Sequence, residues 1–270
     1  MRWLIHPSRP HLLTAAVAVF LLIIGWMLNT PAGLLGKADA VGYAVCHQID
    51  VRSFSIGDRP ISLCARCTGM YLGAMLALGW LAIFRRARSD NPPWIVIGIG
   101  AALVGAFGVD GVNSLANLIP EIPALYPSSN TLRVLTGTGM GLVMGSAVFL
   151  AFNQTVWATR DAQPVLGSVR DAGALIGLGL VGVALALSGN PLILYPLTLI
   201  SATGVLVLLT MIYSLVILLL SRQDNQIQTW KQLTLPLSGG LFLAMLQVAG
   251  LDLIRFWLTG TWEGFHVFLG

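Results

Sequence analysis

All three cysteines of the chain lie in one short stretch, CHQIDVRSFSIGDRPISLCARCTG, directly ahead of a long apolar segment. Cys64 and Cys67 have the Cys-x-x-Cys spacing that lets two thiolates bind one tetrahedral ion. Cys46 adds a third thiol and His47 an imidazole, and three cysteines with one histidine form a known structural zinc set. The stretch therefore predicts a zinc-like metal site made by Cys46, His47, Cys64 and Cys67.

The same cysteines have two other interpretations. A Cys-x-x-Cys pair at the outer end of a membrane helix resembles the pair of quinone-linked disulfide oxidases. There the helix N-terminus and Arg66 would lower the pKa of a thiol of Cys64 or Cys67, and Cys46 could exchange with the pair. Against this, the chain has an odd number of cysteines and no second pair to pass electrons on. The third interpretation is a purely structural disulfide between Cys46 and one partner.

The composition places these residues in a membrane protein. Of the 270 residues, 56% are hydrophobic and only 10% are charged, and the mean hydropathy is +0.81. Soluble domains carry roughly 25% charged residues, so this chain has too few charges to cover a soluble surface. The net charge of +4 comes from basic residues between apolar segments, which is typical of membrane orientation and not of nucleic-acid binding.

The apolar segments predict an all-α polytopic helical bundle. A spanning helix needs about 20 mostly apolar residues, and seven segments qualify. They are 12–29, 66–84, 94–112, 132–152, 172–188, 196–220 and 235–257. Pro92-Pro93, Pro191 and Pro196 are expected to mark the gaps between helices. Glycines recur at small-residue spacing, at Gly69 and Gly73 and then at Gly137, Gly141 and Gly145, and they predict close helix packing.

The basic residues predict the orientation of the bundle. Nine of them fall in the N-terminal segment and in alternate connections: Arg2, Arg9, Arg85, Arg86, Arg88, Arg160, Arg170, Arg222 and Lys231. The positive-inside rule then puts the N-terminus in the cytoplasm and the C-terminus outside the plasma membrane. Lys37, Arg52 and Arg59 lie in the first connection, on the outer side, together with the cysteines.

Polar residues gather where four of the predicted spans reach that outer side. Ionisable residues within a membrane are costly and usually mark a working site. We expect two catalytic residues, Asp110 as a general base and Arg133, which would grip an anionic group together with Arg66. The expected substrate-binding residues are Arg66, Asn113, Asn130 and Thr136. Guanidinium groups bind phosphate through paired hydrogen bonds, so the substrate would be a lipid or a small anion. Each residue also has a structural interpretation, such as Ser129 or Asn130 capping a helix.

Several motifs together resemble a family of uncharacterised bacterial and archaeal membrane proteins, domain of unknown function 2085. They are Cys-His-Gln, Cys-x-Arg-Cys-x-Gly, an Asp-Gly pair and Arg-x-x-Thr-Gly, within residues 42–145. The matching positions are Cys46, His47, Gln48, Arg52, Ser53, Cys64, Arg66, Cys67, Thr68, Gly69, Asp110, Gly111, Asn130, Arg133, Thr136 and Gly137. The resemblance implies a site but no reaction, and nothing about helices beyond residue 145.

We therefore expect a single transmembrane domain over residues 1–270, with a Cys/His core in 42–145 and additional helices in 146–270. One hypothesis is a membrane enzyme in which the metal activates water or polarises a lipid or anionic substrate. Asp110 is the reserve metal ligand if His47 does not reach the ion. Quinone-linked redox chemistry at Cys64 and Cys67, or transport with structural cysteines, are the alternatives. The sequence lacks HExxH and GxSxG motifs, so it does not decide whether the protein is an enzyme.

Overall fold

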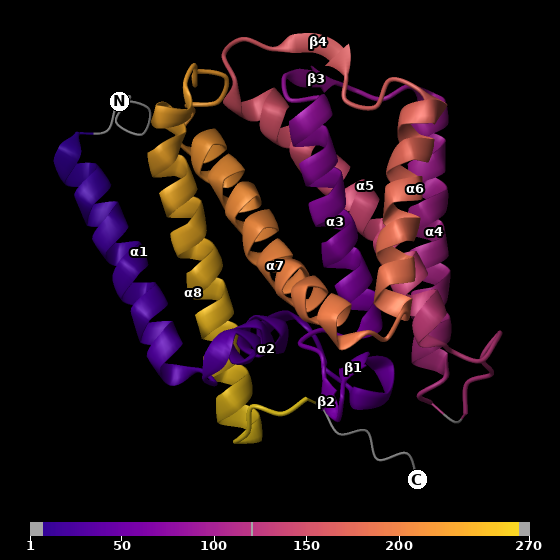
Figure 1. The fold of residues 1–270 in the computed structure, drawn as a ribbon. Helices are drawn as coiled ribbons and strands as arrows, with labels where there is room; N and C mark the ends of the chain where they lie inside the picture. Colours follow the sequence, from indigo (N-terminus) through magenta and orange to yellow (C-terminus); the bar gives the residue numbers. More distant parts are fainter. Residues whose placement is uncertain (1–7, 120, 265–270) are drawn as a thin grey trace.

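The structure, a computed structural model, describes residues 8–119 and 121–264, and it is mostly helical (Figure 1). Among these described residues, seven helical segments are long and apolar enough to cross a membrane, which confirms the seven predicted spans. They are α1 (Arg9–Asn29), α3 (Ala65–Phe84), α4 (Trp94–Ala116), α5 (Asn130–Val156), α6 (Val169–Leu187), α7 (Pro191–Leu220) and α8 (Thr234–Thr259), the last preceded by the 3₁₀ turn η2 (Trp230–Leu233). The chain is thus a helical multi-pass membrane protein.

Helix α7 begins earlier than the sequence predicted, and the expectation that Pro196 lies in a gap is wrong. The helix begins at Pro191, where a missing N–H group costs nothing, and the Asn190 side chain caps it by accepting from Leu192 N at 3.0 Å. Pro196 lies inside the helix. Interior prolines are tolerated in membrane helices because neighbouring groups satisfy the freed carbonyl.

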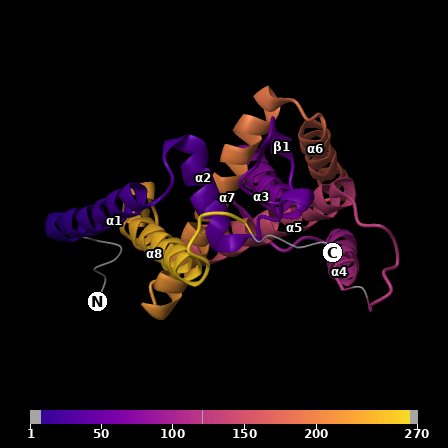
Figure 2. The same ribbon diagram turned by 90° about the horizontal axis from the view of Figure 1, so that it is seen from below.

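One helix was not predicted. α2 (Gly33–Val45) is too short to span a membrane and lies across one end of the bundle, against α7 and α8 (Figure 2). Its conformation depends on tertiary contacts, since a Cβ atom on Gly42 would lie 1.9 Å from the carbonyl oxygen of Ser62. The remaining short elements are η1 (Asp50–Arg52), the antiparallel pair β1 (Ser55–Ile56) and β2 (Arg59–Pro60), and the parallel pair β3 (Arg88–Asp90) and β4 (Asp161–Pro164).

The bundle has two chemically different ends. At the lower end in Figure 1, here called the cysteine end, α2 and the β1–β2 hairpin lie beside the C-terminal ends of α4 and α8 and the start of α7. At the opposite end, here called the basic end, lie β3, β4, the start of α8 and the start of α1. The two ends therefore separate the cysteine stretch from most of the arginines.

Helices α3 and α5 form the tightest contact in the bundle, and glycine makes it possible. A Cβ atom on Gly141 would lie 2.0 Å from the Met70 carbonyl oxygen, and one on Gly69 would lie 2.4 Å from the Val134 carbonyl oxygen. Such distances leave no room for a side chain. This confirms the predicted close packing, and it holds the N-terminal turn of α3, with its cysteines, at a fixed depth against α5.

Candidate metal centre

The three cysteines come from the facing ends of two helices. Cys46 is the C-cap of α2, and Cys64 is the N-cap of α3, with Cys67 in the first turn of that helix. The seventeen residues between Cys46 and Cys64 fold back on themselves through η1 and the β1–β2 hairpin. As a result, side chains that are distant in the sequence meet at the point where α2 ends and α3 begins.

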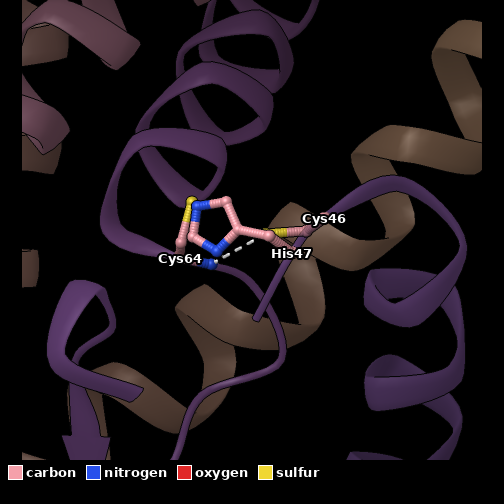
Figure 3. Close-up of side chains that lie close together, drawn as sticks. All are labelled: Cys46, His47 and Cys64. Atoms are coloured by element: carbon pink, nitrogen blue, oxygen red, sulfur yellow. Dashed lines mark hydrogen bonds between the residues drawn. The ribbon is translucent and has the colours of Figure 1, made fainter. Parts of the chain in front are cut away.

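Cys46, His47 and Cys64 lie close enough to hold one metal ion, because their candidate ligand atoms are all within 4.8 Å of one another (Figure 3). The thiol of Cys67 forms hydrogen bonds with both Cys46 and Cys64 but is not one of that group of three. All three cysteines are free, and Cys46 and Cys64 are buried. The residues predicted as metal ligands are thus brought together, with Cys67 at the edge of the group.

Two backbone amides point at the sulfur of Cys46. Gln48 N donates to Cys46 Sγ at 3.5 Å, and Cys64 N donates to the same sulfur at 3.3 Å. The first contact depends on Gln48, whose φ of 51° turns the chain back toward Cys46. The Gln48 side chain fixes this turn by donating to the carbonyl oxygens of Asp39 and Ser62 at 3.0 and 2.9 Å. Amide donors of this kind stabilise a negatively charged sulfur.

The imidazole of His47 is oriented by the backbone. Its Nδ1 atom accepts a hydrogen bond from Ile49 N at 3.0 Å, so in the neutral ring the proton is on Nε2. The other ring nitrogen lies beside the sulfur of Cys64 (Figure 3), to which His47 donates a hydrogen bond. A histidine that binds a metal through Nε2 usually donates its Nδ1–H to an acceptor, and here that position faces a donor instead.

The thiols of Cys46 and Cys64 differ in how easily they lose a proton. Hydrogen bonds from Cys46, Cys67 and His47 hold the pKa of the Cys64 thiol well below its usual range, against the opposing effect of burial. Donation from Cys46 to Cys64, together with burial, raises the pKa of the Cys46 thiol to about 12. The cluster therefore favours negative charge on Cys64 over Cys46, and the N-terminus of α3 adds to that preference.

Helix α8 closes the site from the side opposite α3. Arg255 donates to the carbonyl oxygens of Tyr43 and Cys46, both at 2.6 Å, and its guanidinium lies 3.9 Å from the centre of the Tyr43 ring. Next to it, a cavity of about 390 Å³ reaches Cys46 and His47. Apolar side chains of α8 line its other wall, namely Leu251, Ile254 and Leu258. The sequence pattern gave no sign that Arg255 holds the cysteine loop.

The residues predicted to line a pocket also come together, on the other side of α3. Arg66 forms an ion pair with Asp110, which is 1% exposed. Asp110 also accepts hydrogen bonds from Tyr126 and Thr136, each at 3.3 Å. Each oxygen of this carboxylate thus has a partner within the protein, so the geometry favours a positioning role for Asp110.

Three further residues of the predicted pocket form hydrogen bonds with loops or with each other, namely Asn113, Asn130 and Arg133. Asn113 Oδ1 accepts from Leu125 N at 2.7 Å, and Asn113 Nδ2 donates to the Tyr126 carbonyl at 3.0 Å, which fastens the loop before α5. Asn130 accepts from Arg133 at 2.8 Å and donates to the carbonyl oxygens of residues 51 and 53. The structural alternative for Ser129 is confirmed, because its hydroxyl accepts from Leu132 N as the N-cap of α5.

Positive charge exceeds negative charge in this network. Arg52 and Arg133 are 8% and 6% exposed, and their guanidinium groups donate to the carbonyl and the hydroxyl of Ser114, respectively. Burial and the neighbouring Arg66 lower the pKa of Arg52. Asp110 is the carboxylate that faces these three arginines in the described residues. The excess positive charge adjoins Cys64, so it adds to the stabilisation of a thiolate there.

The ion pair makes a stability prediction. Asp110→Asn is expected to destabilise the protein by about 3–5 kcal/mol, because it leaves the partly buried charge of Arg66 without a counter-charge. The double variant Arg66→Met/Asp110→Leu should recover most of the loss. Arg59→Gln, which breaks a half-exposed pair with Asp39, is the control and should cost about 0–1 kcal/mol. Thermal unfolding in detergent measures all three, and a double variant no more stable than Asp110→Asn would contradict the assignment.

Comparison with known proteins gives two matches. Residues 46–147 match the family described as a predicted membrane protein, DUF2085, which confirms the resemblance found in the sequence. The matched part covers the cysteine stretch, α3, α4 and most of α5, and it ends before α6. An uncharacterised protein of the archaeon Methanocaldococcus jannaschii is 28% identical over 120 residues, which are 44% of this chain and 70% of that protein. No solved structure matches the chain.

Proposed function

We propose that this membrane protein binds a soft divalent metal ion, zinc in the first instance, between Cys46, Cys64 and Cys67. The observation that carries the proposal is that Cys46, His47 and Cys64 come within reach of one ion. The Cys67 thiol is hydrogen-bonded to both cysteines, and two backbone amides are directed at the sulfur of Cys46. Thiolate sulfurs select zinc and other soft ions. Amide donors directed at a sulfur stabilise its thiolate form, and the thiolate is the form that binds a metal.

His47 supports the site from outside the coordination shell. Its Nδ1 atom faces the Ile49 amide, so the proton belongs on Nε2 and the ring donates to Cys64. We therefore assign the metal three thiolate ligands and a fourth position that no cysteine fills. In zinc enzymes such an open position holds water or substrate, and the ion lowers the pKa of bound water or polarises a carbonyl or phosphoryl oxygen.

The cavity beside Cys46 indicates the class of substrate. Its α8 wall is apolar, and Arg255 is its cationic group. A membrane lipid or another amphiphile with a small anionic head fits this combination of surfaces. In this proposal Asp110 and Arg133 position the cysteine loop and α5, while Arg66, Asn113, Asn130 and Thr136 belong to the same supporting network.

A second candidate is thiol–disulfide exchange with a membrane quinone. The low pKa of the Cys64 thiol, next to the Cys46 thiol and a cavity with an apolar wall, favours it. In that reaction a disulfide forms between Cys46 and Cys64, and two electrons leave the sulfurs. The quinone takes up these electrons with one proton from Cys46 and one from solvent, and becomes a quinol.

Metal analysis and a thiol count separate the two candidates. Purified protein, prepared without reductant or chelator, is expected to contain about one zinc per chain and three cysteines that react with a thiol reagent after chelation and denaturation. Protein without metal and with a single reactive thiol would overturn the metal site and support the quinone reaction instead.

We infer that the site faces the extracytoplasmic side. The loops and helix ends of the basic end hold Arg85, Arg86, Arg88, Arg160, Arg170, Arg222 and Lys231, as the positive-inside rule requires of a cytoplasmic surface. Alkaline phosphatase fused after residue 270 should be active, and green fluorescent protein at the same place should be dark. Fluorescence without phosphatase activity would place the cysteine end in the cytoplasm.

A further inference from the structure

A second cavity, unrelated to the cysteines, lies near the basic end of the bundle. It measures about 680 Å³ and lies between α3, α5, α7 and α8. Its inner wall is apolar, with Leu78, Phe149, Phe152, Val207, Met211 and Leu237. Its rim is different in kind, since Arg86, Asn153, Trp157 and Trp230 surround it. The cavity thus has an apolar interior and a cationic, aromatic rim.

The packing of α3 and α7 explains why space exists at this end. Near the cysteine end the two helices touch, since a Cβ on Gly204 would lie 3.1 Å from the Tyr71 carbonyl and Ser201 donates to the Thr68 carbonyl. Toward the basic end α3 and α7 move apart (Figure 1). The side chains of Val207 and Met211 on α7 then face the widening gap and line the cavity.

Arg86 supplies the charge at the rim. Its guanidinium lies over the Trp230 ring at 5.4 Å, and Trp230 packs edge-on against Trp157 at 4.9 Å. Arg85, its neighbour, is neutralised by Asp171. Within residues 8–119 and 121–264, no carboxylate forms an ion pair with Arg86. Arg86 therefore retains its full charge and five donors for a ligand.

The surrounding charge selects the sign of that ligand. Eight basic residues lie at the basic end, Arg9, Arg85, Arg86, Arg88, Arg160, Arg170, Arg222 and Lys231, against four acidic ones, Asp90, Asp161, Asp171 and Asp224. An anion at the rim thus gains from the whole surface as well as from Arg86. An acidic phospholipid of the bilayer fits this cavity, because its acyl chain can occupy the apolar interior while its anionic headgroup lies at the cationic rim.

We propose that the cavity between α3, α5, α7 and α8 is a specific site for an anionic phospholipid, with the acyl chain on Val207 and Met211 and the phosphate at Arg86. The Trp230 indole, packed edge-on against Trp157, holds the Arg86 guanidinium at the rim, which leaves its donors directed to one headgroup. The lipid fills the space where α3 and α7 diverge, so the bound protein is more stable than the lipid-free one.

Native mass spectrometry tests the site in neutral detergent. The delipidated full chain is mixed with equal amounts of phosphatidylglycerol and phosphatidylcholine of identical acyl chains. We expect selective retention of phosphatidylglycerol, and a loss of about tenfold or more in Arg86→Gln, because a hydrogen-bonded charge is removed. Arg160→Gln removes the same charge from the same end, but its guanidinium donates to the Gln154 carbonyl outside the cavity, so its retention should be unchanged.

A second variant tests the acyl chain. Val207→Trp fills the interior without changing charge, and it should reduce retention of phosphatidylglycerol while thermal unfolding confirms that the variant is folded. Equal losses in Arg86→Gln and Arg160→Gln would show general attraction to a basic surface and overturn the proposal. Equal retention of phosphatidylcholine, or complete displacement by inorganic phosphate, would overturn it as well.

Discussion

Replacing Cys64 with serine is expected to remove the metal from the purified protein. Cys64 contributes the sulfur whose thiol pKa is held well below its usual range, by hydrogen bonds from Cys46, Cys67 and His47. A serine hydroxyl at this buried position does not ionise near neutral pH, so it cannot replace a thiolate ligand. Cys46→Ser and Cys67→Ser should also lose the ion during dialysis against a weak chelator, as measured by elemental analysis.

His47→Ala is the variant to compare with the cysteine variants. His47 follows Cys46 directly in the same loop, but in this account only the cysteine is a metal ligand. Since we place the imidazole outside the coordination shell, this variant should still bind about one zinc, with an affinity lower by about 10–100-fold. Competition with a chromophoric chelator measures that difference. If His47→Ala lost the ion as completely as Cys64→Ser, the imidazole would be a ligand. If all four variants kept wild-type metal, the cysteines would not bind it.

Gly141→Ala is expected to cause the largest loss of stability among glycine substitutions in the membrane-spanning helices. The added methyl group would lie 2.0 Å from the carbonyl oxygen of Met70, which is backbone and cannot move aside alone. Helices α3 and α5 must then separate, at a cost of about 1–3 kcal/mol or more. Thermal unfolding in detergent, followed by the fraction of protein that stays monodisperse, measures the effect.

The matched control is Gly105→Ala on α4. Nothing lies within 4 Å of a Cβ atom there, so the variant should be neutral or slightly stabilising, since alanine is the better helix former. The same change at two helical glycines thus has opposite expected signs. Equal unfolding temperatures for the two variants would show that α3 and α5 are not packed as closely as described.

The spans were predictable because membrane thickness fixes the length of an apolar segment. Pro196 was misjudged because proline is a reliable boundary mark in soluble helices and a poor one in membrane helices. α2 was not predicted, since a 13-residue segment with three glycines has little helical tendency of its own. Contacts such as that of Gly42 with Ser62 hold it in place, and they depend on the folded bundle.

The convergence of the polar residues followed from topology, but their partners did not. Alternating connections bring Asp110, Asn130 and Arg66 to one end of the bundle, whatever the packing. Which side chains then touch depends on helix rotation and loop path. The sequence could not show that Arg255, far outside the matched family region, donates to the Cys46 carbonyl, or that Ile49 fixes the ring of His47.

X-ray absorption at the zinc edge of the purified protein tests the central claim most directly. The account predicts a shell of about three sulfur atoms at about 2.3 Å with one lighter ligand, and the loss of one sulfur in any cysteine variant that still retains zinc. A shell made only of nitrogen and oxygen would contradict it, because the ion would then lie away from Cys46, Cys64 and Cys67.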